Sequence, residues 1–211
     1  MTGYITRWLP LSGVLAALAL ALTGLISPPP PVAGTGAAEI VAYYSLHRSV
    51  LEVESIADGI GVTLLVIFAA TLHARLHTAV SMAAYVGAAI VAASTLAQVA
   101  AFHALAFRPD PEPVRAALLN DLQSFTFQVT TFPILLFLGA AGVAILTSRE
   151  LPRWLGLAAV VAGVLQAVSW VSFFAPPGVL ASGGVPDIAA FGAMLAWVVV
   201  CSITMVVKSR R

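Results

Sequence analysis

The chain has 211 residues, of which 60% are hydrophobic and 9% are charged, with a mean hydropathy of +1.00. A soluble domain carries about 25% charged residues, so this composition excludes an ordinary water-soluble globular protein. The formal net charge of +1 comes without a basic cluster, which argues against nucleic acid as a partner. The single cysteine, Cys201, excludes an intrachain disulfide and a cysteine-based metal site.

Six long apolar segments follow one another and predict an all-α fold, a polytopic membrane helix bundle in a single domain covering residues 1–211. The expected transmembrane helices are residues 9–26, 59–76, 79–107, 125–146, 154–174 and 188–207. A cleaved signal peptide is the alternative for the first segment, because small residues follow it. Its apolar run is, however, longer than the ~7–15 residues of a usual signal.

The stretch between the first two spans, residues 38–56, has the spacing of an amphipathic helix, with apolar residues on one side and charged residues mostly on the other. We expect this helix to lie near the outer surface, and it can continue into the second span. His47, Glu54 and Asp58 lie close to one line on it. That line fits either a solvated face or a face that binds a ligand or a metal.

Lysine and arginine are distributed unevenly between the two sides of the membrane that these spans define. By the positive-inside rule, the larger number on the side of both termini places the termini in the cytoplasm. The seven on that side are Arg7, Arg75, Arg149, Arg153, Lys208, Arg210 and Arg211, and the three on the other side are Arg48, Arg108 and Arg115. Eight of the nine acidic residues lie outside, so the outer face is net negative and can attract cations.

A polar stripe enters the fourth span from its outer end. Asp121, Ser124, Gln128 and Thr131 are spaced by three or four residues, so on a helix they lie along one face. Pro133 is expected to kink this helix and to leave a backbone carbonyl without its usual donor. Lipid cannot satisfy such groups, so we expect the stripe to face protein or water. This face is the candidate ligand-binding site.

Three further side chains are weaker candidates for the same site, namely Asp58, His103 and Gln166. They come from the outer parts of other spans and form one site only if the helices pack so that they converge. For Gln128 and Gln166 the alternative role is hydrogen bonding between helices, worth ~0.6 kcal/mol per contact on average. No catalytic residue and no metal ligand is assigned.

His73 and His77 lie four residues apart in the turn after the second span, a spacing that can bind a metal on a helix. No third ligand is near them in the sequence, and the glutamate of the zinc-protease motif is missing. An interfacial turn is therefore the favoured interpretation of this segment.

Three short segments resemble a known family. Together with the overall pattern, Tyr43–Arg48, Leu72–Leu76 and Leu151–Gly156 are similar to a family of bacterial, mainly actinobacterial, multi-span membrane proteins of unknown function. The resemblance implies an integral protein of the bacterial inner membrane with five or six helices. It supplies no reaction, cofactor or catalytic residue.

The sequence favours a non-enzymatic membrane protein that contacts lipid and binds a small or lipid-like ligand, or a membrane partner protein, in its outer half. No cofactor is expected. A small-solute transporter or channel is the alternative, motivated by Pro133 and the polar stripe. No charged residue lies deep in a span, however, where ion-coupled transporters usually keep one. A haem-carrying or enzymatic subunit is less favoured, because His47 and His103 are the only outer pair of histidines.

Overall fold

The computed structural model describes residues 8–26, 28–107, 112–171 and 184–208. Within these ranges the chain forms helices and turns and no strand, which confirms the all-α prediction. The elements are η1 (Leu9–Leu11), α2 (Ser12–Ile26), α3 (Ala37–Leu46), α4 (Arg48–Leu76), α5 (Ala79–Phe107), α6 (Pro113–Val129), α7 (Thr131–Ser148), α8 (Arg153–Val171) and α9 (Val185–Lys208).

Six helical segments in this part of the chain are long and apolar enough to cross a membrane, so the chain is a multi-pass membrane protein. They are Leu9–Ile26, Arg48–Leu76, Ala79–Phe107, Pro113–Ser148, Arg153–Trp170 and Val185–Lys208, one for each expected span. The expected end of the fifth span, at residue 174, and most of the loop after it lie outside the described residues.

The six spans form a ring in which each contacts the next, in the order α2, α4, α5, α7, α8 and α9, and α9 returns to α2. Aromatic side chains fill part of its interior. Trp197 of α9 meets Phe68 of α4 and Phe137 of α7 edge-on, with ring centroids 6.2 Å and 5.7 Å away. The Trp197 indole N–H donates a hydrogen bond to the Leu155 carbonyl at 2.9 Å, so its polar group is satisfied inside the apolar bundle.

The backbones of α5 and α7 approach closely at Gly87. A Cβ atom at this position would lie 2.6 Å from the Phe137 nitrogen and 3.0 Å from the Pro133 oxygen. Only a residue without a side chain therefore fits, as is common where membrane helices pack tightly. This contact holds the middle of α7 against α5.

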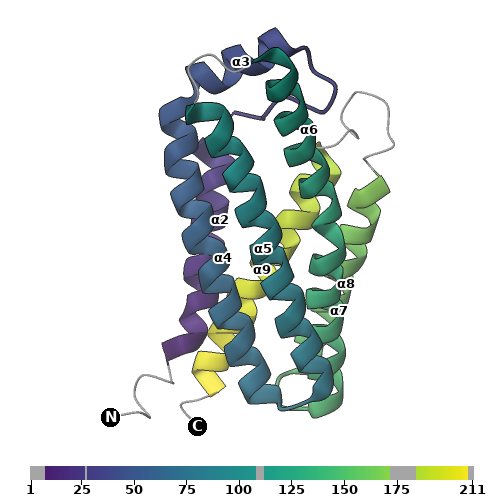
Figure 1. Ribbon diagram of the computed structural model, residues 1–211. Coiled ribbons are helices and arrows are strands. Elements are labelled where there is room, and N and C mark those ends of the chain that lie inside the picture. The colour runs from purple at the N-terminus through teal and green to yellow at the C-terminus, as the bar shows by residue number, and fades with distance from the viewer. Residues whose placement is uncertain (1–7, 27, 108–111, 172–183, 209–211) are drawn as a thin grey trace.

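The helix α2 begins and α9 ends at the same end of the ring, which we call the base (Figure 1). At ~1.5 Å per residue, α4 and α5 are each about 43 Å long, whereas the hydrocarbon layer of a bilayer is about 30 Å thick. These helices and α6 extend beyond the rest of the ring at the opposite end, where α3 lies across them (Figure 1). We call this part the cap; it comprises α3, α6, residues 48–57 of α4 and residues 99–107 of α5.

The amphipathic stretch 38–56 is two helices, because the helix breaks at His47, whose φ and ψ are −104° and 13°. The His47 Nδ1 atom lies 2.9 Å from the Tyr43 carbonyl, which also accepts the His47 backbone N–H at 3.0 Å. The histidine thus caps the end of α3. The second half of the stretch continues without interruption into the second span, as α4, which confirms the expected continuation.

The fourth span is interrupted between Val129 and Thr131, close to where Pro133 predicts a kink. Pro133 lies in the first turn of α7 and has no N–H to offer the Val129 carbonyl. At the junction, the Thr130 hydroxyl donates a hydrogen bond to the Thr126 carbonyl at 2.7 Å. The break separates the cap helix α6 from the membrane helix α7.

Candidate functional site

The cap has a hydrophobic cluster of its own, distinct from the cluster that fills the ring. Side chains from α3, α4, α5 and α6 contribute to it, so the four elements pack as one unit. Its buried members are Ile40, Tyr44, Leu51, Phe102, Leu105 and Ala116. The predicted outer amphipathic helix is therefore one wall of a small packed layer and does not lie alone on the membrane surface.

Two neighbouring side chains of α6 hold the segment that connects α2 to α3. The Gly34 backbone N–H donates a hydrogen bond to the Asp121 carboxylate at 3.0 Å. The Asn120 amide nitrogen lies 3.2 Å and 3.3 Å from the carbonyls of Pro31 and Val32, and Asn120 is fully buried. These contacts fix the connecting segment against the cap.

The two tyrosines of α3 complete this attachment. The Tyr43 hydroxyl donates to the Pro28 carbonyl at 2.7 Å, and the Tyr44 hydroxyl lies 3.4 Å from the Asn120 side-chain oxygen. Burial and, next, the Glu54 carboxylate raise the pKa of Tyr43 to about 12. Burial first, followed by the neighbouring Tyr43 and Glu54, also raises the pKa of Tyr44. Both phenols therefore keep their protons near neutral pH.

Polar side chains also lie where the cap meets the ring. At ~1.5 Å per residue, Asp58 is about 27 Å along α4 from the base and Gln98 about 28 Å along α5, close to the ~30 Å thickness of the hydrocarbon layer. The Gln98 side-chain amide donates to the Thr130 hydroxyl at 3.3 Å, and the buried Thr23 of α2 donates its hydroxyl to the Leu20 carbonyl at 2.8 Å. This level corresponds to one edge of the membrane and not to its midplane.

The polar stripe, which runs along α6 to the first residue of α7, faces the protein, as its spacing predicts. Gln128 and Thr131 are buried, while Asp121 and Ser124 are partly buried. The Ser124 hydroxyl lies 3.5 Å from the side-chain oxygen of its neighbour Gln123. The hydrogen bond of Asp121 to the connecting segment gives it a role in holding the cap, and its role in ligand binding stays a prediction.

The three weaker candidates lie on three different helices. Asp58 is partly buried on α4, the ring of the partly buried His103 on α5 stacks near Phe107 at a centroid distance of 6.2 Å, and Gln166 is buried on α8. In the ring, α7 stands between α5 and α8. The structure thus places Gln166 on the other side of α7 from His103, and the two do not extend the stripe as one continuous surface.

Three buried polar residues near the stripe were not among the predicted site residues, namely Asn120, Gln123 and Thr130. Asn120 and Gln123 lie three residues apart on the helix face beside the stripe. An asparagine and a glutamine at this spacing within the apolar sequence of α6 were the available signal. Their partners could not be found in the same way, because the contacts of Asn120 reach Tyr44 and the connecting segment.

Acidic residues outnumber basic ones at the cap end of the described chain. The acids there are Glu39, Glu52, Glu54, Asp58, Glu112, Asp121 and Asp187, and the bases are Arg48 and Arg115. Each arginine pairs with a glutamate at 3.1 Å, Arg48 with Glu52 and Arg115 with Glu112. Both pairs are exposed and contribute little stability. The remaining acids leave this end with a net negative charge.

The turn with His73 and His77 lies at the base and is closed by a reciprocal capping box at the start of α5. The Ser81 N–H donates to the Thr78 hydroxyl at 3.0 Å, and the Thr78 N–H donates to the Ser81 hydroxyl at 3.2 Å. Among the described residues, no group of three or more histidine, cysteine, aspartate and glutamate side chains is placed to hold a metal ion.

Comparison with known proteins gives no relative from which a function could be transferred. No protein-family model, no curated protein and no solved structure matches this chain. The site is therefore interpreted from its own residues.

Proposed function

We propose that this chain is a non-enzymatic protein of the bacterial inner membrane that binds a ligand or a partner subunit through its cap. The observation that carries the proposal is the cap itself, a packed layer with its own hydrophobic cluster that extends beyond the apolar ring. A protein that needed only to span the membrane would not require such a layer. Loops and caps on a rigid scaffold commonly carry binding functions.

The distribution of positive charge supports an orientation with the cap outside the cell and both termini in the cytoplasm. Among the described residues, Arg75, Arg149, Arg153 and Lys208 lie at the base, against Arg48 and Arg115 at the cap end. This contrast follows the positive-inside rule. Two of these side chains also bond to backbone carbonyls at the base, since Arg75 donates to the Met205 carbonyl at 2.7 Å and Lys208 to the Glu150 carbonyl at 2.9 Å.

The net negative charge of the cap end favours a positively charged ligand, or a partner subunit with a basic segment. An excess of acidic side chains raises the local concentration of cations and speeds their association, with a range of about 8–10 Å at physiological salt. We therefore expect a bound species whose retention decreases as the salt concentration rises.

Isolation from native membranes in a mild detergent, followed by native mass spectrometry, tests this function. We expect a species bound to the wild type. It should be lost in the double variant Glu39→Lys, Glu54→Gln, which changes two acids of the cap. The matched control is Glu150→Lys at the base, which should retain that species. Equal retention by the cap and base variants would contradict the proposal.

A small-solute transporter is the second candidate, supported by the interrupted span α6–α7. Transporters often place such a break near the midplane, where it builds a binding site. In this chain the break at Thr130 is about 27 Å along the helix from Ser148, at ~1.5 Å per residue. The break therefore lies near the cap and not at the midplane. Solute uptake into proteoliposomes that is abolished by Gln128→Leu would favour this candidate over binding alone.

A further inference from the structure

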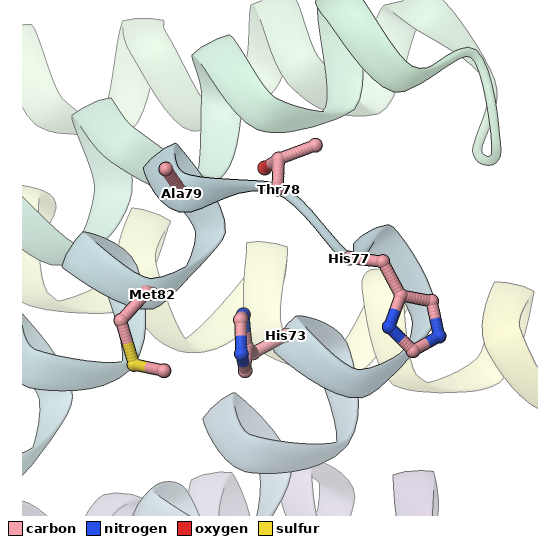
Figure 2. Close-up of a pocket in the computed structure, with 5 residues that line it drawn as sticks. All are labelled: His73, His77, Thr78, Ala79 and Met82. Atoms are coloured by element: carbon pink, nitrogen blue, oxygen red, sulfur yellow. The ribbon is translucent and has the colours of Figure 1, made fainter.

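A hollow of about 510 Å³ lies at the base, at the opposite end of the molecule from the cap. It is formed where α4 ends and α5 begins, and it is lined by His73, His77, Thr78, Ala79 and Met82. Figure 2 shows the ring of His73 between the side chains of Met82 and His77, with the ring of His77 directed away from the other two. Two imidazoles and a thioether thus share one hollow, and no carboxylate lines it.

Hydrogen bonding determines which nitrogen of His73 is available. The Ser81 hydroxyl donates its single proton to the Thr78 carbonyl at 2.8 Å. When the hydroxyl proton is directed to that carbonyl, the His73 Nδ1 atom, 2.8 Å from the same hydroxyl oxygen, is the donor in its own contact. In the neutral imidazole this leaves a free electron pair on Nε2. Histidines that bind metals usually have this arrangement, with the other ring nitrogen donating to a neighbouring group.

The other two side chains are accessible. His77 is exposed and adopts a left-handed conformation, with φ of 51° and ψ of 35°, at the end of α4. A left-handed backbone is uncommon for a residue other than glycine, and here the capping box of the next helix follows directly. Met82 is 45% exposed although it is apolar, so its thioether is free to reach a ligand in the hollow.

We propose that this hollow binds a monovalent copper ion, Cu(I), through Nε2 of His73 and the thioether sulfur of Met82, and that the exposed imidazole of His77 turns toward them as a third ligand. Thioether and imidazole are ligands that suit copper, and a thioether in particular selects the soft Cu(I) ion. Calcium and magnesium require oxygen ligands, which the side chains of His73, His77 and Met82 do not supply. Structural zinc sites usually add cysteine, or a further histidine, to reach four ligands.

This site is independent of the proposed cap function, because it uses residues at the other end of the bundle. If the base faces the cytoplasm, the site lies in a reducing compartment, in which thiols remain reduced and Cu(I) is the expected copper state. The structure assigns to the base a place that can hold a copper ion at the membrane surface.

The test is Cu(I) binding by the purified full-length protein in detergent, under anaerobic reducing conditions, in competition with coloured Cu(I) chelators of graded affinity. We expect one copper ion per chain, and a loss of affinity of about tenfold or more in His73→Gln and in Met82→Leu, as for other changes near metal ligands. Met82→Leu conserves volume at an exposed position, so the fold should be kept. X-ray absorption of the loaded protein should show sulfur and nitrogen neighbours.

The matched control is His103→Gln, which removes a histidine at the cap end and should leave Cu(I) affinity unchanged. The proposal is wrong if the wild type takes no copper from the weakest chelator. It is also wrong if Met82→Leu and His73→Gln bind copper as tightly as the wild type, because the bound ion then lies elsewhere.

Discussion

The backbone N–H of Gly34 donates a hydrogen bond to the carboxylate of Asp121 at 3.0 Å, joining the segment after the first span to the helix that enters the fourth. The two residues are 87 positions apart in the sequence. Together with the contacts of Asn120, this bond makes the connection between α2 and α3 a fixed part of the cap. The cap surface that we propose as a binding face depends on this attachment.

Replacing Asp121 by alanine should release the connecting segment. The bond has a charged acceptor but is exposed, so we expect a loss of about 1 kcal/mol in the stability of the cap. Asp121→Asn keeps a side-chain oxygen and should behave nearly as the wild type. Limited proteolysis of residues 28–36 measures the effect, with Ser124→Ala as the control. If the alanine variant resists protease as well as the wild type, the attachment does not depend on Asp121.

Asn120 should be more important than Asp121 for stability, because it is fully buried and contacts three groups. Asn120→Ala leaves the Pro31 and Val32 carbonyls without this donor, which should cost about 1–3 kcal/mol. Asn120→Asp should be worse, since it removes the donor and buries a charge. Thermal unfolding in detergent measures both. If Asn120→Asp unfolds at the same midpoint temperature as the wild type, Asn120 does not have the buried environment that the structure describes.

The six spans could be predicted from the sequence because their signal is local. A run of about 20 apolar residues is visible whatever it packs against. The inward direction of the stripe from Asp121 to Thr131 was likewise predictable, because helical spacing places these side chains on one face.

The cap could not be predicted in the same way, because its core joins residues that are distant in the sequence. Ile40 and Tyr44 pack with Phe102, Leu105 and Ala116, and no periodicity within one helix indicates that pairing. The break at His47 was missed for a related reason. His47 was read as one position on a continuous amphipathic face, whereas its side chain closes α3 through the Tyr43 carbonyl.

Gly87→Ala should separate α5 from α7. The added Cβ would meet the backbone of Phe137 and Pro133, which cannot rotate away, and overpacking of this kind costs about 1–3 kcal/mol. Gly139→Ala is the matched control, because a Cβ there meets nothing within 4 Å. Unfolding in detergent by heat or denaturant should show a loss for the first variant and little change, or a gain, for the second. Equal effects would mean that the two helices are not in close contact at Gly87.

Tyr43 should resist deprotonation. With its pKa raised to about 12 by burial and by Glu54, its phenol stays neutral where an ordinary tyrosine, with a pKa of 10.0, has lost its proton. The folded state therefore binds this proton more tightly than the unfolded state, so the stabilisation is complete below pH 10 and is lost as the pH rises toward 12. The tyrosinate difference spectrum between the wild type and Tyr43→Phe, followed as the pH rises, gives the midpoint pH at which Tyr43 loses its proton. Glu54→Gln should lower this midpoint pH, and an unchanged value would show that Glu54 is not close to the phenol.

The orientation of the bundle gives the most direct prediction for cells. The native Cys201 is fully buried and should not react with a membrane-impermeant maleimide, so new cysteines can be placed without removing it. Ser45→Cys, exposed on α3, should be labelled in intact cells. Arg149→Cys, exposed in the turn between α7 and α8, should be labelled only after the membrane is permeabilised. The positive charge at the base predicts this result.

The opposite labelling pattern would place the acidic cap in the cytoplasm and the hollow with His73, His77 and Met82 outside the cell. That result would overturn the proposed orientation, whereas the helix bundle itself would be unaffected.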